Sequence, residues 1–166
     1  LEQPNSDAVD FVKDFRLNLY ASEIFVFTPE GDLKSLPQGA TPVDFAFNIH
    51  TEIGMHTRGA KINGKIVPLS YRLRSGDQVE IITSEKSFPN PSWLDYVITT
   101  RARSRIRSFL REDKKKIAME GKEVLRRKLK QLKIGFNDKT IDKLLTFFIL
   151  NTTLDLYLRV GSGTID

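Results

Sequence analysis

The chain has 166 residues, of which 40% are hydrophobic and 28% charged, and its mean hydropathy is -0.30. This composition is typical of a globular chain with room for one or two small domains. No apolar run approaches the roughly 18 residues needed to cross a bilayer, and there is no cysteine. Disulfides, thiolate catalysis and cysteine zinc sites are therefore excluded, and a reducing, cytoplasmic location is expected. Because the chain begins with Leu1 and a polar stretch, we expect it to be part of a longer protein.

Charge is distributed unevenly along the chain. Residues 1–100 carry 9 Lys and Arg against 13 Asp and Glu, a net of -4, whereas residues 101–133 carry 14 against 4, a net of +10. This change of sign predicts a domain boundary between Trp93 and Arg101, with different partners on its two sides. The basic part would suit RNA, anionic lipid or an acidic protein.

The first predicted elements are a helix and a hairpin. Apolar residues recur mostly at helical spacing over residues 7–19, which predicts a leading helix. Residues 24–28 are β-branched and aromatic, and residues 33–36 alternate apolar with polar after a Pro-Glu-Gly-Asp turn. These two segments predict a β-hairpin.

A short helix follows the hairpin. Thr41 is its predicted N-cap and Pro42 its first residue. Asp44, three positions after Thr41, can return a hydrogen bond to the cap and form a near capping box. The apolar face of this helix ends with His50, and the helix is predicted to end near residues 53–54.

The next elements complete a small mixed domain. Asn63-Gly64, between residues 59–62 and 65–68, is a strong signal for a two-residue hairpin turn. Alternation over residues 79–83 predicts a last strand. The order strand, strand, helix and three strands is that of the ubiquitin-like β-grasp fold, so the expected class is α+β.

These residues resemble a known family. The segments IFVFTPEGDLKSLPQGATPVDFAFNIHTEIG and GAKINGKIVPLSYRLRSGDQVEIITS are similar to a TGS domain and, with WLDYVITTRARSRIRSFLR, to the regulatory half of RelA/SpoT-homologue alarmone enzymes. The resemblance implies a linker over residues 1–22, a TGS domain over 23–85 and a small all-α helical domain over 86–166. It also implies a parent protein that makes and hydrolyses (p)ppGpp with ATP, GTP and a divalent metal. Its catalytic domains would precede Leu1, which leaves no cofactor in this chain.

The resemblance also implies partners. In the family, the TGS domain contacts the CCA 3′ end of an uncharged tRNA in the ribosomal A site, where an attached amino acid would clash. His50 matches the histidine of the family's AFxIH segment, which meets this 3′ end, and an imidazole can stack on an unpaired base or donate to a phosphate. The alternative is a histidine that closes the helix and bonds only to Thr51 or Glu52.

Further candidates for the tRNA 3′ end follow His50 in the chain. His56 lies in Met55-His56-Thr57, where the family commonly carries His-Arg-Cys, so this loop departs from the family pattern. Arg58, Lys61 and Lys65 could hold phosphates around the CCA end, or could be solvated charges at a strand edge. No metal site is expected, because the two histidines have only one close carboxylate.

The remainder is predicted to be helical. Apolar spacing predicts four helices, over residues 92–110, 114–133, 138–149 and 153–160. The candidate contacts to an RNA backbone are ten basic residues of the first two helices: Arg101, Arg103, Arg105, Arg107, Lys114, Lys115, Lys116, Arg126, Arg127 and Lys128.

The first four of these arginines form two rows, one of which could face RNA while the other faces solvent or the preceding domain. Such a run of charge is also typical of a solvated face, although the excess of one sign favours phosphate contacts. A membrane-surface role fits less well, because the apolar faces are needed for packing.

Three functions remain open from the sequence. The chain could sense uncharged tRNA on the ribosome in the stringent response, bind a protein such as acyl carrier protein, or act as an intramolecular brake on upstream catalytic domains. No Walker-type glycine loop or Ser-His-Asp candidate is present, so no catalytic residue is expected in this chain.

Overall fold

The computed structural model describes Val9 and residues 22–165, so the predicted leading helix lies outside the described residues, Val9 excepted. The chain divides into two compact units, residues 1–110 and residues 111–166. Each unit is described by itself.

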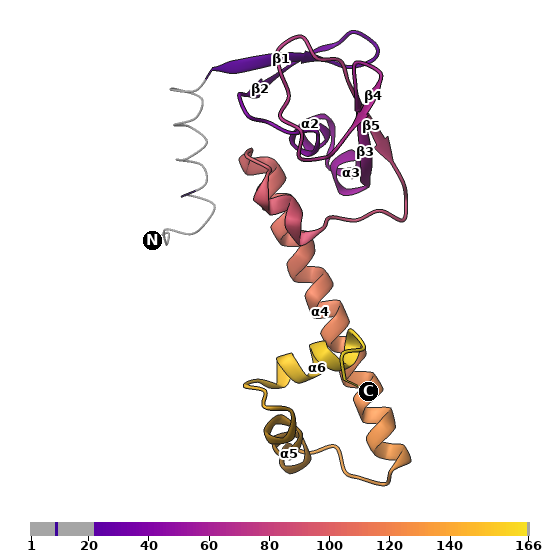
Figure 1. Ribbon diagram of the computed structural model, residues 1–166. Coiled ribbons are helices and arrows are strands. Elements are labelled where there is room, and N and C mark those ends of the chain that lie inside the picture. Colours follow the sequence, from indigo (N-terminus) through magenta and orange to yellow (C-terminus); the bar gives the residue numbers. More distant parts are fainter. Residues whose placement is uncertain (1–8, 10–21, 166) are drawn as a thin grey trace. The chain divides into compact units, whose positions relative to one another are not determined.

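The first unit contains two small sheets (Figure 1). Strands β1 (Glu23–Phe27) and β2 (Leu33–Pro37) form the predicted antiparallel hairpin. The second sheet has the order β4-β3-β5. Its strands are β3 (Thr57–Ile62), β4 (Lys65–Val67) and β5 (Val79–Thr83).

The connections between these strands follow their turn residues. Asn63 and Gly64 adopt φ values of 53° and 84°, the left-handed pair that a tight hairpin turn requires. A parallel bridge from Phe27 to Gln78 joins the two sheets. The five strands and the turn between β3 and β4 confirm the strands that the sequence predicts.

Helix α2 (Pro42–Ile49) packs on one face of the strands. Its N-terminus has the predicted capping box, in which the Thr41 hydroxyl accepts the N–H of Asp44 and the Asp44 carboxylate accepts the N–H of Thr41. Phe45 is 1% exposed and packs among strand residues such as Val26. This arrangement confirms the predicted α+β class with a β-grasp domain.

The predicted helix after Thr41 does not run on past its eighth residue, which corrects the prediction of one helix to residues 53–54. The backbone is extended at His50, with φ -164° and ψ 145°, and a second helix, α3 (Thr51–Met55), starts there. The break turns Gly54 onto the ring of buried Phe47, where a Cβ atom would overlap the ring. As a consequence His50 is exposed instead of closing an apolar face.

A second correction concerns the long helices. In place of two helices over residues 92–110 and 114–133, the structure has a short 3-10 helix, η1 (Pro91–Asp95), and one helix of 32 residues, α4 (Thr100–Gln131). The charged residues 111–113, between the two predicted helices, therefore continue the helix and do not interrupt it.

A buried carboxylate explains where α4 begins. Asp44, 1% exposed, accepts the backbone N–H groups of Ile98 and Thr99 and the Thr99 hydroxyl. These N–H groups bond to a side chain and not to a carbonyl of a preceding helical turn, so no helix runs through them. Trp93 and Val97 are buried in the same core as Phe47, which holds this segment against α2.

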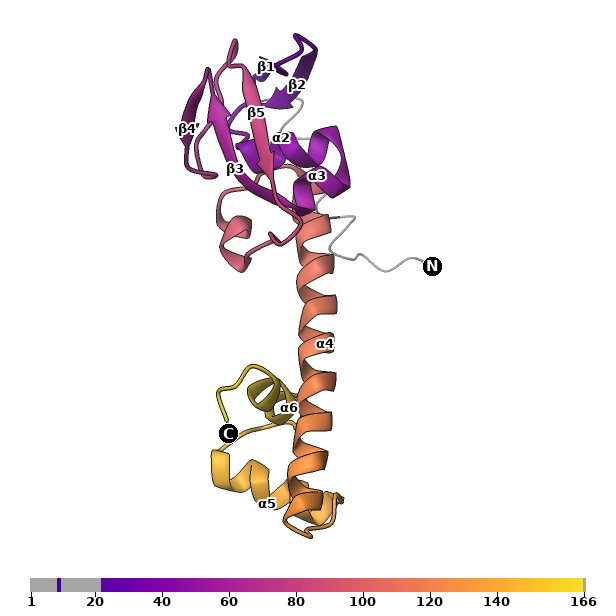
Figure 2. The same ribbon diagram turned by 90° about the vertical axis from the view of Figure 1, so that its right-hand side faces the viewer.

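The second unit contains the C-terminal part of α4 with α5 (Asp138–Phe148) and α6 (Thr153–Gly161), as Figure 2 shows. Asn137 and Thr152 cap α5 and α6, and both helices begin where the sequence predicts. Helices α4 and α6 meet at glycines: a Cβ on Gly121 would overlap the Tyr157 carbonyl oxygen.

Among the residues that the structure describes, no single helix is long and apolar enough to cross a membrane. Helices α5 and α6 satisfy the length and composition requirement only as a pair, which is bent by 72° at its break.

Candidate nucleic-acid interface

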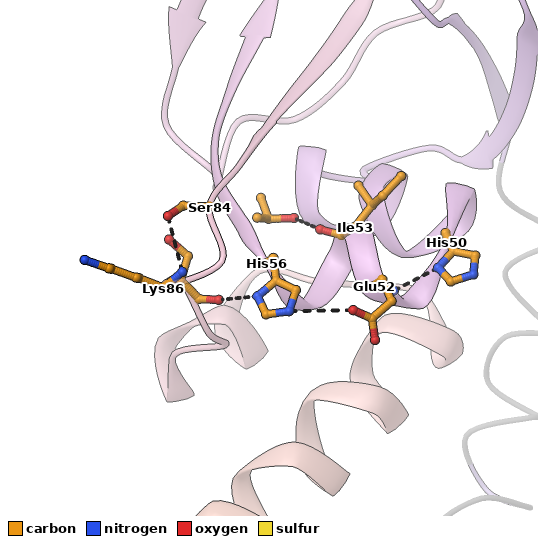
Figure 3. Close-up of polar contacts among 8 residues, drawn as sticks. His50, Glu52, Ile53, His56, Ser84 and Lys86 are labelled. Carbon is orange, nitrogen blue, oxygen red and sulfur yellow. Dashed lines mark hydrogen bonds and ion pairs between the residues drawn. The ribbon is translucent and has the colours of Figure 1, made fainter.

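His50 lies at the junction of α2 and α3 and caps the second helix. Its Nδ1 accepts the backbone N–H of Glu52 at 3.0 Å. An accepting Nδ1 carries no proton, so the neutral ring carries its proton on Nε2. The side chain is exposed, and Figure 3 shows its ring on the far side of Glu52 from His56. The imidazole can therefore present an N–H donor and a ring face to a ligand.

His56 ends α3 and has the opposite tautomer. Its Nδ1 lies 2.9 Å from the carbonyl oxygen of Ser87, and because a carbonyl only accepts, Nδ1 carries the proton. The ring is half-buried, and its Nε2 lies 3.6 Å from a carboxylate oxygen of Glu52. His56 thus ties the loop after β5 to α3.

Glu52 links the two histidines (Figure 3), because its N–H donates to His50 and its carboxylate faces His56. This carboxylate side chain is 75% exposed, so the ion pair with a protonated His56 contributes little stability. Within Val9 and residues 22–165, no group of three histidine or carboxylate side chains could hold a metal ion.

The basic residues of β3 and β4 occupy different positions. Arg58 is exposed and lies at the irregularity in the β3–β5 pairing between Thr57 and Gly59. Lys61 alternates with buried Ala60 and so faces away from α2, on the side of the sheet opposite to that helix. Lys65, next to the hairpin turn, is exposed.

The two predicted arginine rows at the start of α4 differ in exposure. Arg101 and Arg105 are exposed, whereas Arg103 and Arg107 are partly buried. The Arg103 guanidinium donates to the Val97 carbonyl at 2.8 Å, so it supports the segment that precedes the helix. The row of Arg101 and Arg105 is therefore the one that a ligand can reach.

Arg101 also lies close to the chain that leads to His50. It lines a hollow of about 270 Å³ together with Asn48, in the last turn of α2, and Thr99. Arg101, a predicted phosphate contact, thus lies on the same surface of the first unit as the last turn of α2. This turn leads to His50, the predicted contact to the 3′ end.

In the second unit the remaining candidates are all exposed: Lys114, Lys115, Lys116, Arg126, Arg127 and Lys128. Carboxylates lie beside Lys115 and Arg126 at the surface. Lys115 lies 3.7 Å from Glu112, and Arg126 lies 3.7 Å from Glu123 and stacks over the Phe136 ring at 4.5 Å. Exposed pairs of this kind are weak, so phosphate could replace them.

Sequence reasoning missed an aromatic pair beside His56. Phe88 is 52% exposed, and its ring is parallel to that of Phe109, with 5.6 Å between centroids. The His56 ring meets Phe88 edge-on at 5.2 Å. An isolated aromatic residue in the polar segment SEKSFPNP was the available signal.

Comparison with known proteins identifies both parts of the chain. Residues 24–83 match the model of the TGS domain, and residues 108–166 match that of the RelA/SpoT AH domain. The chain is a TGS domain followed by the AH domain of the RelA/SpoT family. The resemblance seen in the sequence is therefore confirmed.

Relatives with assigned names cover the same region. The chain is 44% identical over 82% of its length to a GTP pyrophosphokinase of Myxococcus xanthus, and 37% identical over 99% to one of Escherichia coli K12. It is 43% identical over 98% to a guanosine-3′,5′-bis(diphosphate) 3′-pyrophosphohydrolase of Aquifex aeolicus. The match spans 18%, 23% and 23% of those three proteins, about a fifth of their length.

Proposed function

We propose that this chain is the regulatory part of an enzyme that makes or hydrolyses (p)ppGpp in the stringent response. Its role is to recognise the CCA 3′ end of uncharged tRNA at the ribosomal A site, in the cytoplasm. The names of the relatives support the enzyme class. The observation that carries the recognition step is the exposed imidazole of His50, held between two helices with its Nε2–H directed outward.

The chemistry of His50 suits an unpaired RNA end. Its Nε2–H can donate to a phosphate, a 2′-hydroxyl or a base acceptor, and its ring can stack on a base. Because Nδ1 is used as the cap of α3, the orientation of the ring is set before the ligand arrives. A fixed donor close to the terminal ribose can bond to the free hydroxyl that aminoacylation converts to an ester, which is the proposed basis for discriminating charged from uncharged tRNA.

Basic residues supply the part of the affinity that does not depend on sequence. Arg101 and Arg105 in the first unit, and the six exposed basic residues of α4 in the second, are available to phosphates. Neutralising phosphates releases counterions, so the binding constant should fall steeply as salt increases.

The test is the binding of the chain to uncharged tRNA and to the same tRNA aminoacylated, followed by fluorescence anisotropy across a salt series. We expect tighter binding of the uncharged form, and loss of that preference in His50→Ala with the salt dependence retained. Phe147→Ala is the control, because it removes an exposed neutral side chain of the second unit, where no contact to the 3′ end is predicted.

Equal binding of both tRNAs, unchanged by His50→Ala, would refute recognition of the 3′ end. Binding of acyl carrier protein, or of the upstream catalytic domains, in place of tRNA would instead assign the chain to protein interaction.

A further inference from the structure

Phe88 is held half-exposed by the loop between β5 and η1. The His56 ring N–H donates to the Ser87 carbonyl, and the backbone N–H of Ser84 donates to the His56 carbonyl at 3.0 Å. Phe109 covers one face of the Phe88 ring. Since 52% of Phe88 remains exposed, much of its surface faces solvent in a conformation that is already fixed.

Positive charge lies near this ring. Arg105 precedes Phe109 by four residues in α4, so the two side chains lie on the same side of the helix, and Arg105 is exposed. Lys86, two residues before Phe88, is also exposed, and Figure 3 shows its side chain pointing away from His56. Arg105 therefore lies on the side of α4 that carries the Phe88–Phe109 stack, and Lys86 is a second exposed cation, two residues from Phe88 in the loop.

We propose that the exposed face of Phe88 is a stacking site for an unpaired RNA base, with Lys86 and Arg105 contacting the flanking phosphates. This inference rests on the proposed function and adds a second contact residue to it. A fixed aromatic ring with neighbouring cations is the combination that binds single-stranded nucleic acid, because every base has a face that can stack.

The charge beside His56 favours a base over a phosphate at this point. The Glu52 carboxylate lies 3.6 Å from the ring of His56, which itself contacts Phe88. This exposed carboxylate offers a phosphate no favourable partner beside the ring, and the uncharged face of a base needs none. Lys86 and Arg105 therefore contact the phosphates of the RNA backbone, and the Phe88 ring stacks on the base.

The test uses the full chain and a single-stranded RNA of about eight nucleotides that ends in CCA and carries one 2-aminopurine. Anisotropy gives the affinity, and quenching of 2-aminopurine reports stacking. We expect Phe88→Ala to weaken binding about 5- to 100-fold and to abolish quenching, and Phe88→Trp to retain both. Phe147→Ala is the matched control, because Phe147 is an exposed phenylalanine of the second unit, 77% exposed.

The outcomes separate this inference from the proposed function. If the chain binds RNA in a His50-dependent way but Phe88→Ala behaves as Phe147→Ala, the stacking site is refuted and the proposed function stands. If the unmodified chain binds no RNA, the proposed function fails and the stacking site fails with it. Phe88-dependent binding of a protein with no RNA binding would also overturn the stacking site and would assign the ring to a protein interface.

Discussion

Replacing Asp44 by alanine should destabilise the first unit more than any other single carboxylate change. The carboxylate is buried and accepts five different donors. They are the N–H and hydroxyl of Thr41, the N–H of Ile98, and the N–H and hydroxyl of Thr99. The distances range from 2.8 Å for the Thr99 hydroxyl to 3.2 Å for Ile98.

The expected cost follows from these contacts. Alanine leaves three backbone N–H groups without this acceptor, and each buried unsatisfied donor costs about 1 to 3 kcal/mol. The hydroxyls can rotate to other acceptors, and the buried charge is removed, which offsets part of the loss. We therefore expect Asp44→Ala to lower the free energy of unfolding by about 3 to 5 kcal/mol, a large share of the stability of a typical domain.

The fluorescence of Trp93 during urea unfolding measures this effect. Trp93 is the only tryptophan of the chain and is 5% exposed in the core between α2 and the start of α4. Asp95→Ala is the matched control, since Asp95 is exposed in the same segment and should change the free energy of unfolding by less than about 0.5 kcal/mol. A loss below about 1 kcal/mol for Asp44→Ala would refute the reasoning, because one unsatisfied donor alone exceeds it.

Three further results are expected. Gly121→Ala should lower the free energy of unfolding of the second unit by about 1 to 3 kcal/mol, because its Cβ would overlap the Tyr157 carbonyl. Helix propensity alone predicts a gain of about 1 kcal/mol, so the sign of the change, measured by thermal unfolding followed by circular dichroism, decides between the two. Burial and the charge of Asp44 raise the pKa of Tyr96 from 10.0 to about 12. The neutral phenol therefore stabilises the fold below pH 10, and this contribution should be lost as the pH rises towards 12. The free energy of unfolding, measured across this pH range, should show the loss in the unmodified chain and not in Tyr96→Phe. Gly64→Ala should cost about 1 kcal/mol in urea unfolding, because φ is 84° at that turn position; an unchanged midpoint would contradict this.

Much of the fold could be predicted because the decisive signals are local. The capping box at Thr41 and the Asn63-Gly64 turn depend on neighbours within a few residues, and both appear as expected. The start of the long helix was mispredicted because a distant group competes with helix propensity there. The start of α4 depends on the Asp44 carboxylate, 54 residues before Ile98, and no periodicity in residues 92–110 reveals that partner.

The candidate site could be predicted only in part. His50 was found through its resemblance to the family, but its role as the cap of α3 depends on a backbone break that apolar spacing does not encode. The stack of Phe88 on Phe109 joins a loop to a helix, and such a contact becomes visible only when the tertiary structure brings the two together. Exposure separates the row of Arg101 and Arg105 from its neighbour, which helical spacing alone left open.

The state of the His50 ring tests the central claim most directly. Long-range proton–nitrogen NMR of the two histidines, recorded on the chain with and without a short RNA ending in CCA, reports protonation at each ring nitrogen. The account predicts a proton on Nε2 of His50 and on Nδ1 of His56 in the free chain. Addition of the RNA should shift His50 Nε2, and the same RNA aminoacylated at its 3′ end should not. A His50 resonance that ignores both RNAs, or that responds equally to both, would contradict recognition of an uncharged 3′ end by this residue.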